Sequence, residues 1–421
     1  MKGESLTSET PRRGDGRRPP AVAVTGIGVV SPIGIGRERF WAALADGQSG
    51  IARSEGRLVA AEVPSVAAKV RDFAAREFIT SAQLRRMDNC SRMVVAASRM
   101  ALDDAGIAAA TLPPARVGVI VGSALGDISE SAVQLERVFS KGPAAASPMI
   151  FPNLVLNAAA SYTAMELGVT GVNFTVTQAE TTGEQAIILG CAAVRAGRAD
   201  VVLAGGGDEL AGIVCDIYRR AGALSGQHGG DEWCSPYDAG RNGVVLGEGA
   251  AMLALESAER ARVRGARVYA EIEGDANFSV GAPPYQWPAR APAARVPLRR
   301  LLGDLPVGLI CGSANSSRQL DACELDLFAG VFGGLAGGVY LTSIKGAIGE
   351  FGAAGALSAA AACLALHHQA VPPLCNLRQA EPGAPFLFAG GRGQAQPLGR
   401  ALLCGLGRGG TGAALLFRRA G

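Results

Sequence analysis

Short apolar runs alternate with stretches of helical periodicity along most of the chain. In the first series, runs of strand length lie at residues 117–121, 172–176 and 201–203, and helical stretches lie at 162–167 and 185–198. In a second, shorter series, strands are predicted at 268–273, 307–311, 339–342 and 413–417, and a helix at 355–366. This alternation favours mostly parallel, buried strands with helices on both faces. We therefore expect an α/β fold.

Two segments depart from this rhythm. Residues 1–20 are polar, contain several arginines and end in Pro19 and Pro20, which is typical of a disordered basic tail. Residues 277–300 are rich in proline, and repeated prolines argue against a regular helix or a central strand there. We interpret this stretch as a surface loop, with the altered rim of a pocket as the alternative.

Composition limits the classes of function. A chain of 421 residues that is 48% hydrophobic can bury a large core, while a formal net charge of +3 is too small to indicate nucleic acid or a membrane surface as a partner. The 9 cysteines are scattered without a Cys-x-x-Cys pair, which favours a reducing cytoplasm over disulfides or a zinc site. We find neither a signal peptide nor an apolar run of membrane-spanning length. We therefore expect a cytoplasmic protein without a bound metal.

Several motifs occur in a fixed order. The most informative is FTVTQAETTGEQAI at residues 174–187, in which a strand-like run turns sharply into a helix of small residues. The others are AVAVTGIGVVSPIG at 21–34, VGVIVGS at 117–123, SPMIFPN at 147–153, SPYDAGRNG at 235–243, GEGAA at 247–251, LTSIKGAIGE at 341–350 and GLGRGGT at 405–411.

Taken together, these blocks resemble the β-ketoacyl-acyl-carrier-protein synthases, or ketosynthases, of the thiolase-like superfamily. The resemblance implies a five-layered αβαβα fold made of two pseudo-symmetric halves. We place the division near Asp275, which gives an N-terminal half over residues 21–275 and a C-terminal half over residues 276–421. The resemblance implies no cofactor.

The residues that perform condensation in that family are replaced here. Family members use one cysteine as the nucleophile and two histidines. The resemblance places Glu180 at the cysteine position and Ser313 and Glu350 at the histidine positions, while the family's active-site lysine is retained as Lys345. We expect Glu180, Lys345 and Glu350 to form a buried carboxylate–lysine–carboxylate cluster that plugs the former site, with a water-filled vestige as the alternative.

Other candidate residues do not restore the missing chemistry. The chain has 3 histidines, His228, His367 and His368, and none aligns with a catalytic position. The C-terminal glycine loop (Gly407, Arg408, Gly409 and Gly410) resembles the family's gate loop, with Arg408 where family members carry phenylalanine.

The resemblance favours a non-condensing subunit similar to the chain-length factors of type II polyketide systems. Such a subunit forms a heterodimer with an active ketosynthase, shapes its acyl tunnel and works with an acyl carrier protein; a glutamate at position 180 departs from the glutamine that is common there. The residues that we expect at the tunnel or the shared interface are Phe174, Thr177, Met149, Phe151 and Asn157. Two alternatives stay open, namely a decarboxylase of malonyl-carrier protein and a homodimer that binds a carrier protein or an intermediate. Whether the chain is an enzyme is therefore left open by the sequence.

Overall fold

The computed structural model describes residues 19–53 and 66–421. The prediction of a disordered tail over residues 1–20 thus falls, apart from Pro19 and Pro20, outside the described residues.

The first half of the fold begins with the long buried strand β1, and its last strand, β8, pairs with β1 in antiparallel orientation. Its strands are β1 (Val22–Ser31), β2 (Gly34–Ile35), β3 (Ile51–Arg53), β4 (Val66–Ala68), β5 (Val117–Gly122), β6 (Asn173–Val176), β7 (Val201–Asp208) and β8 (Gly249–Ser257). Its helices are α1 (Arg37–Ala45), α2 (Ser81–Leu84), α3 (Asn89–Asp104), α4 (Ile128–Lys141), α5 (Ala158–Leu167), α6 (Thr182–Arg195), α7 (Gly212–Arg220) and α8 (Ala258–Val263).

The second half repeats the alternation with fewer elements. Its strands are β9 (Ala270–Ser279), β10 (Leu309–Cys311), β11 (Tyr340–Thr342), β12 (Ala370–Val371), β13 (Gln394–Ala395), β14 (Arg400–Leu406) and β15 (Thr411–Arg418). Its helices are α9 (Arg295–Leu302), α10 (Arg318–Phe332), α11 (Lys345–Ile348) and α12 (Ala354–His368).

The two halves have the same sheet topology. The order is β6-β5-β7-β8-β1 in the first half and β11-β10-β14-β15-β9 in the second. In each, the three outer strands are parallel and the last two are antiparallel. Three residue pairs between β1 and β9 join the two sheets, so that their hydrogen bonding is continuous. The matching orders confirm the two pseudo-symmetric halves that we expected.

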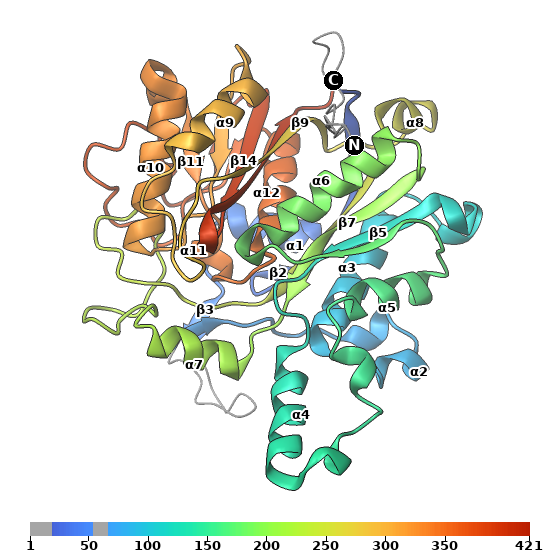
Figure 1. Ribbon diagram of the computed structural model, residues 1–421. Helices are drawn as coiled ribbons and strands as arrows, with labels where there is room; N and C mark the ends of the chain where they lie inside the picture. The colour runs from blue at the N-terminus through green and yellow to red at the C-terminus, as the bar shows by residue number, and fades with distance from the viewer. Residues whose placement is uncertain (1–18, 54–65) are drawn as a thin grey trace, which may run out of the picture.

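Helices form the other three layers. Figure 1 shows α6 and α12 side by side in the centre, with α9 and α10 beyond one sheet and α3 and α5 beyond the other. The buried side chains follow the same division, because one apolar cluster surrounds α6 and α12 and two others lie under the outer helices. The expected five-layered αβαβα arrangement is therefore confirmed.

Small residues allow the two central helices to approach closely. Every residue of α12 from Ala354 to Leu366 is buried, as expected for a helix that is apolar on all sides. On α6, a Cβ added at Gly183 would lie only 2.5 Å from the backbone nitrogen of Ala356. Glycine at position 183 therefore lets the start of α6, where Glu180 lies, pack directly against α12.

Two expectations about the middle of the chain need correction. Asp275 lies inside β9, the strand equivalent to β1, so the topology divides the chain between α8 and β9 rather than at Asp275. The proline-rich stretch is also shorter than predicted, because β9 continues to Ser279 and α9 begins at Arg295. Pro297 is tolerated as the third residue of α9, since the first backbone N–H groups of a helix have no intrahelical acceptor. Among the described residues, no helix is long and apolar enough to cross a bilayer.

Candidate functional site

Glu180 lies at a sharp turn between β6 and α6. A short 3-10 turn, Ala179–Thr181, links the two elements, and Ala179 has a φ of +46°, in the left-handed region that non-glycine residues rarely adopt. Thr182 holds the turn, because its Oγ1 accepts a hydrogen bond from the backbone N–H of Gln178 (2.7 Å) and donates one to Val176 O (3.0 Å). Glu180 is thereby placed at the N-terminal end of α6, where the helix dipole favours a negative charge.

Arg408 binds the carboxylate of Glu180. It lies in the 3-10 turn Arg408–Gly410 between β14 and β15; its Nε donates to Glu180 Oε1 (2.7 Å) and its backbone N–H donates to Oε2 (3.0 Å). A guanidinium nitrogen also contacts Glu180 Oε1 and the hydroxyl oxygen of Tyr218. Glu180 is only 5% exposed. Glu180 and Arg408, which we expect at the cysteine and gate positions, therefore form one ion pair in which the carboxylate is buried and the guanidinium group is partly exposed.

Aromatic rings hold the guanidinium group of Arg408 in place. Its central carbon lies 4.7 Å from the ring centre of Tyr218 and 5.3 Å from that of Trp287. Burial alone would lower the pKa of Arg408, but Tyr218 and Glu180 outweigh it and raise that pKa above its ordinary value. The side chain consequently stays charged and fixed over Glu180.

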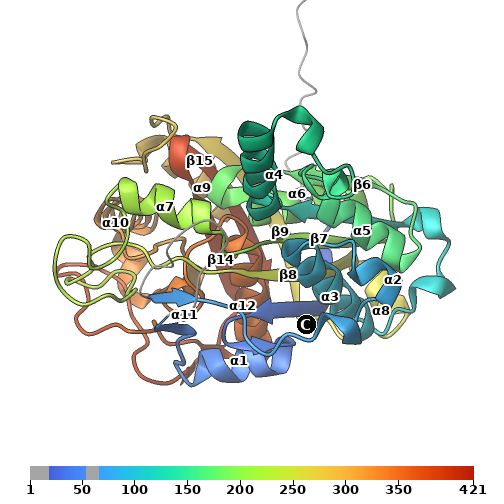
Figure 2. The same ribbon diagram turned by 90° about the horizontal axis from the view of Figure 1, so that it is seen from below.

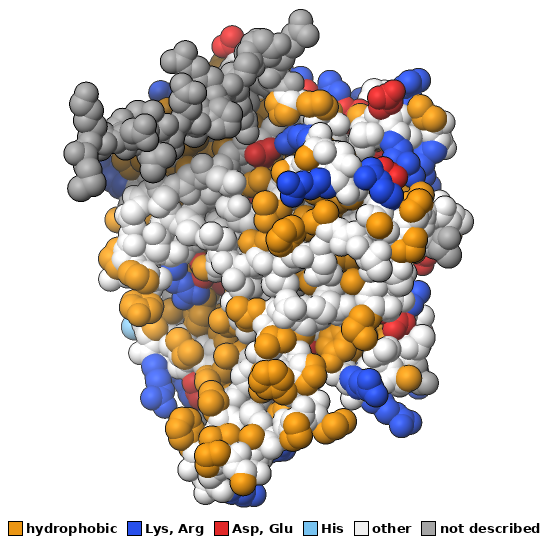
Figure 3. All heavy atoms as spheres, turned by 45° about the vertical axis from the view of Figure 1, so that its right-hand side comes forward, with side chains coloured by type: hydrophobic (Ala, Val, Ile, Leu, Met, Phe, Trp, Pro, Cys, Tyr) orange, Lys and Arg blue, Asp and Glu red, His pale blue; other side chains and the backbone are white. Residues whose placement is uncertain are grey.

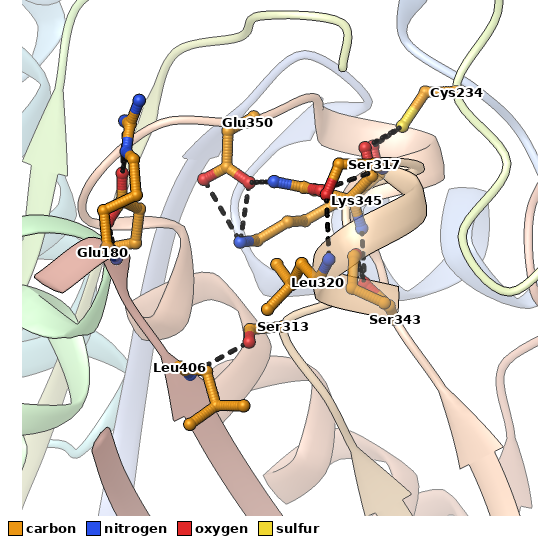
Figure 4. A network of polar contacts seen from close by, with 12 residues as sticks. Glu180, Cys234, Ser313, Ser317, Leu320, Ser343, Lys345, Glu350 and Leu406 are labelled. Atoms are coloured by element: carbon orange, nitrogen blue, oxygen red, sulfur yellow. Dashed lines mark hydrogen bonds and ion pairs between the residues drawn. The ribbon is translucent and has the colours of Figure 1, made fainter. Parts of the chain in front are cut away.

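Lys345 and Glu350 form a second, separate ion pair. Lys345 Nζ lies 2.9 Å and 3.1 Å from the two carboxylate oxygens of Glu350, and Asn315 Nδ2 donates to Glu350 at 2.6 Å. Burial raises the pKa of Glu350, while Glu350 raises the pKa of Lys345 against the effect of burial. Figure 4 shows this pair apart from the contacts of Glu180.

The expected cluster of Glu180, Lys345 and Glu350 is therefore corrected. Lys345 does meet Glu350, but the polar contacts of Glu180 are made with Arg408 instead. The reason is geometric, since the gate loop brings a guanidinium group over the turn that carries Glu180. The charge of Glu180 still favours the protonated form of Lys345 at longer range.

Ser313, at the first histidine position, belongs to a buried network. It follows β10, its Oγ donates to Glu324 Oε1 (2.7 Å), and the backbone N–H of Leu406 donates to that Oγ (3.0 Å). The second oxygen of Glu324 accepts from the hydroxyl of Tyr237 (2.7 Å). Its hydroxyl therefore links the end of β10 to β14 and to Glu324 in one buried network.

The sequence analysis missed Glu184. It lies one helical turn after Glu180 on α6 and is buried, and its Oε2 has no hydrogen-bond partner among the described residues. Its carboxyl group fits between two glycines, since a Cβ would meet it at 2.0 Å from Gly355 and at 2.4 Å from Gly405. Burial raises the pKa of Glu184 to about 7. An acidic residue within a helix of small and apolar residues is the signal that could have found it.

No histidine or cysteine replaces the missing groups. His228 lies on an exposed loop with its Nε2 2.9 Å from Gly222 O. His367 and His368 end α12, where His367 meets the ring of Tyr269 edge-on and His368 stacks on Trp41. All nine cysteines are buried and unpaired, and burial raises the pKa of Cys311 to about 12. Among the described residues, no group of three or more His, Cys, Asp or Glu side chains is placed to hold a metal ion.

A cavity of about 670 Å³ opens on the outer side of Arg408. Its walls include Tyr218, Asn242, Trp287 and Ser317, as well as Arg408 itself. Glu180, Lys345 and Glu350 do not line it. Arg408 therefore lines the cavity and also contacts Glu180, which does not line it.

The residues expected at a tunnel or interface lie on one side of the first half. Phe174 is on β6, the terminal strand of the sheet, and its side chain is exposed, as are those of Met149 and Phe151. Thr177 and Asn157 are exposed on the same segments, and Asn157 Nδ2 donates to Ser161 Oγ (3.2 Å). Seen from below in Figure 2, α4 stands out from the molecule on the same side as β6 and α6.

Comparisons with known proteins agree with this architecture. A family model described as "Beta-ketoacyl synthase, N-terminal domain" matches residues 20–261, and one described as "Beta-ketoacyl synthase, C-terminal domain" matches residues 269–378. A relative from Streptomyces virginiae, "Putative polyketide beta-ketoacyl synthase 1", is 33% identical over 417 residues, which cover 95% of this chain and 98% of the relative.

Two solved structures extend the comparison. "The ishigamide ketosynthase/chain length factor" has a TM-score of 0.88 and 29% identity and covers 96% of this chain and 100% of its own. "AntDE:AntF (apo): type II PKS acyl-carrier protein in complex with its ketosynthase bound to the hexaketide" has a TM-score of 0.86 and 26% identity, with coverage of 96% and 100%.

Proposed function

The chain belongs to the beta-ketoacyl synthase family, and from this we propose that it is a non-condensing subunit that pairs with an active ketosynthase and shapes its acyl tunnel. In this respect it would act as a chain-length factor does. The proposal places it in type II polyketide or fatty-acid-like biosynthesis, with an acyl carrier protein as a further partner.

The ion pair between Glu180 and Arg408 carries the proposal. A condensing subunit needs a thiolate that accepts the acyl group and donors that stabilise the developing negative charge. Here the nucleophile position holds a carboxylate that already accepts three hydrogen bonds from Arg408. Attack by this carboxylate on a thioester would break that pair and give a high-energy mixed anhydride. The arrangement therefore supports a structural role for Glu180.

The exposed edge of the first sheet supports a partner subunit. β6 pairs with β5 on one side only, and an unpaired strand edge is a template for pairing with another chain. Exposed apolar side chains flank that edge, among them Phe174 and Met165. A second ketosynthase fold could pair with this strand edge, continue the sheet and bury these apolar side chains.

The names of the two structural neighbours support the choice of partners. One is called a ketosynthase/chain length factor, and the other is a ketosynthase in complex with an acyl-carrier protein. Both comparisons cover 96% of this chain, so nearly all of the fold is shared with these two structures.

The test is the native mass of this chain after co-expression with the ketosynthase of the same genome that retains Cys, His and His. A one-to-one heterodimer is the expected result. A homodimer that does not exchange with the ketosynthase would contradict the proposal. In that case, release of carbon dioxide from malonyl-carrier protein, or binding of the carrier protein alone, would decide between the two alternatives left open by the sequence.

A further inference from the structure

The proline-rich loop between β9 and α9 forms one wall of the cavity beside the gate loop. Tyr285, Gln286 and Trp287 of this loop line the cavity. The loop is attached at two points, because Gln286 O accepts from the backbone N–H of Gly409 (3.2 Å) and Trp287 O accepts from Gln319 Nε2 (2.8 Å). These contacts hold its aromatic side chains at the rim of the cavity.

The walls of the cavity combine aromatic rings with positive charge. Tyr218, Tyr285 and Trp287 contribute rings, and Arg318 and Arg408 contribute guanidinium groups. None of the described residues that line the cavity is an aspartate or a glutamate. The volume of about 670 Å³ is in the range of small-molecule sites. The cavity therefore suits a small ligand that has both an apolar ring and a negative charge.

Arg408 keeps donors that such a ligand can use. Its Nε and Nη2 bind Glu180 and Tyr218, whereas Nη1 has no hydrogen-bond partner among the described residues. The side chain is 28% exposed, so solvent or a ligand reaches part of it. Because the carboxylate of Glu180 already balances its charge, Arg408 alone would attract an anion only weakly.

Arg318 supplies the positive charge that is not balanced. It is the first residue of α10, its side chain is exposed, and its Nε donates to Arg241 O (3.2 Å). No carboxylate of the described residues forms an ion pair with it. Since a guanidinium group has five N–H donors, most of those of Arg318 are available to a ligand. One carboxylate group matches this single unbalanced charge.

The rings at the rim favour an aromatic ligand over an aliphatic one. Tyr285 is 89% exposed, and Trp287 is half-buried beside the guanidinium group of Arg408. A planar ring can stack on either side chain and remove its apolar surface from water, with a gain beyond the area that it buries. An aliphatic chain would cover the same surface without stacking.

We propose that this cavity binds a small aromatic carboxylate, with the carboxylate at Arg318 and Nη1 of Arg408 and the ring against Tyr285 or Trp287. The contact between Arg408 and Glu180 stays intact when the ligand binds. The inference goes beyond the proposed function and does not depend on it, since this chain binds the ligand without a partner subunit.

The test measures the dissociation constant of 2-naphthoate for the full chain by isothermal titration calorimetry. Two further compounds separate the ring from the charge, namely 2-naphthylmethanol, which is neutral, and octanoate, which has no ring. We expect 2-naphthoate to bind about tenfold more tightly than 2-naphthylmethanol, because of its charge-assisted hydrogen bonds, and about threefold more tightly than octanoate, because of stacking. Equal affinity for 2-naphthoate and either of the other compounds would overturn the proposal.

Three exposed positions provide matched variants. Arg318→Gln should weaken the binding of 2-naphthoate about fivefold and leave that of 2-naphthylmethanol unchanged. Tyr285→Ser should weaken the binding of both. Arg290→Gln, an exposed change on the same loop outside the cavity, is the control and should alter neither. Loss of affinity in the control as large as that in Arg318→Gln would contradict a specific contact.

A second surface has to be excluded as the binding site. Figure 3 shows hydrophobic side chains gathered over the lower part of the molecule, where Leu135 and Phe139 of α4 are exposed. Phe139→Ser should leave the dissociation constant of 2-naphthoate unchanged, and a large increase would assign the binding to α4 instead.

Two outcomes with the wild-type chain would also overturn the proposal. Tighter binding of pantetheine, the neutral arm of a carrier protein, than of 2-naphthoate would make the cavity an entrance for that arm. Absence of heat at millimolar 2-naphthoate would show that the cavity does not bind aromatic carboxylates. Neither outcome changes the native mass measured with the ketosynthase, so the proposed function would stand or fall separately.

Discussion

At the scale of single residues, Glu180 and Arg408, the two departures from the ketosynthase pattern, compensate each other. A glutamate buried at position 180 without a partner would be strongly destabilising, and an arginine at position 408 without a carboxylate would lose its orientation. Together they form a charged, hydrogen-bonded contact at the mouth of a cavity. The coupling free energy between Glu180 and Arg408 is therefore the quantity to measure.

We expect Arg408→Ala to lower the free energy of unfolding by about 1–3 kcal/mol, because it leaves the buried carboxylate with only the backbone N–H of residue 408 as a donor from this loop. Glu180→Ala should cost less, since Arg408 keeps some access to solvent. The double variant should cost less than the two single changes added together, with a coupling of about 1–2 kcal/mol. Urea unfolding of the four proteins measures this. Additive changes in the free energy of unfolding would show that the contact between the two side chains adds nothing to stability.

Glu184 gives the stability of the chain a dependence on pH. Its pKa is raised to about 7 in the folded protein by burial, so the folded state holds a proton that the unfolded state releases near its ordinary pKa of about 4.5. Stability from this group is therefore lost as the pH rises from about 4.5 to about 7. Asp321, whose pKa burial likewise raises to about 7, acts in the same direction.

The variant Glu184→Gln should consequently raise Tm at pH 8.5 and change it little at pH 5, where the wild-type carboxyl group is already neutral. Differential scanning fluorimetry at the two pH values measures the difference. Glu136→Gln, an exposed change on α4, is the matched control and should shift Tm equally at both. An equal effect of Glu184→Gln at pH 5 and pH 8.5 would contradict a buried carboxyl group that titrates near pH 7.

At the scale of secondary-structure elements, the close contact between α6 and α12 positions the site. We expect Gly183→Ala to destabilise the protein by about 1–3 kcal/mol, since the new Cβ would lie 2.5 Å from Ala356 N and push the helices apart. Gly334→Ala, where nothing lies within 4 Å of the added Cβ, is the control. Chemical unfolding measures the stability of both variants. Equal stability of the two would show that α6 and α12 can move apart at no cost.

Much of the element order follows from the sequence. The apolar runs at 172–176 and 201–203 became β6 and β7, and the helix between them became α6. β7 is buried along its whole length, as a continuous apolar run predicts, whereas β6 is a partly exposed edge strand. β14 was not predicted, since its residues Arg400–Leu406 run into a glycine motif that gives no clear strand boundary. β9 extends to Ser279 because it contains no proline, and α9 accommodates Pro297 because the first turn of a helix needs no donor at that position.

The site was only partly predictable for a different reason. The resemblance to ketosynthases singles out Glu180, Ser313, Glu350 and Lys345. Their partners do not, because Arg408 is 228 residues from Glu180 and Leu406 is 93 residues from Ser313. Contacts between such distant residues are set by the packing of whole layers, and no local pattern in the chain records them.

At the scale of the whole molecule, four separate elements supply the positions that condensation would need. Glu180 precedes α6, Ser313 follows β10, Glu350 follows α11 and Arg408 lies between β14 and β15. Each is held by its own partners, so that restoring one group leaves the others locked in structural contacts. The proposed loss of condensation is thus distributed over several positions, and a single substitution would not reverse it.

We therefore expect Glu180→Cys to give no condensation, with a rate below about a thousandth of that of the intact ketosynthase, because general acid–base groups typically contribute 10²–10⁴ each and both histidines are absent. Carbon dioxide release from malonyl-carrier protein with an acyl donor measures the rate, and the ketosynthase alone is the positive control. Alkylation by iodoacetamide shows whether the new thiol is reachable past Arg408. Turnover by Glu180→Cys close to that of the control would mean that Lys345 or Glu350 can replace the histidines, and the chain would then have to be regarded as a condensing enzyme that lacks only its nucleophile.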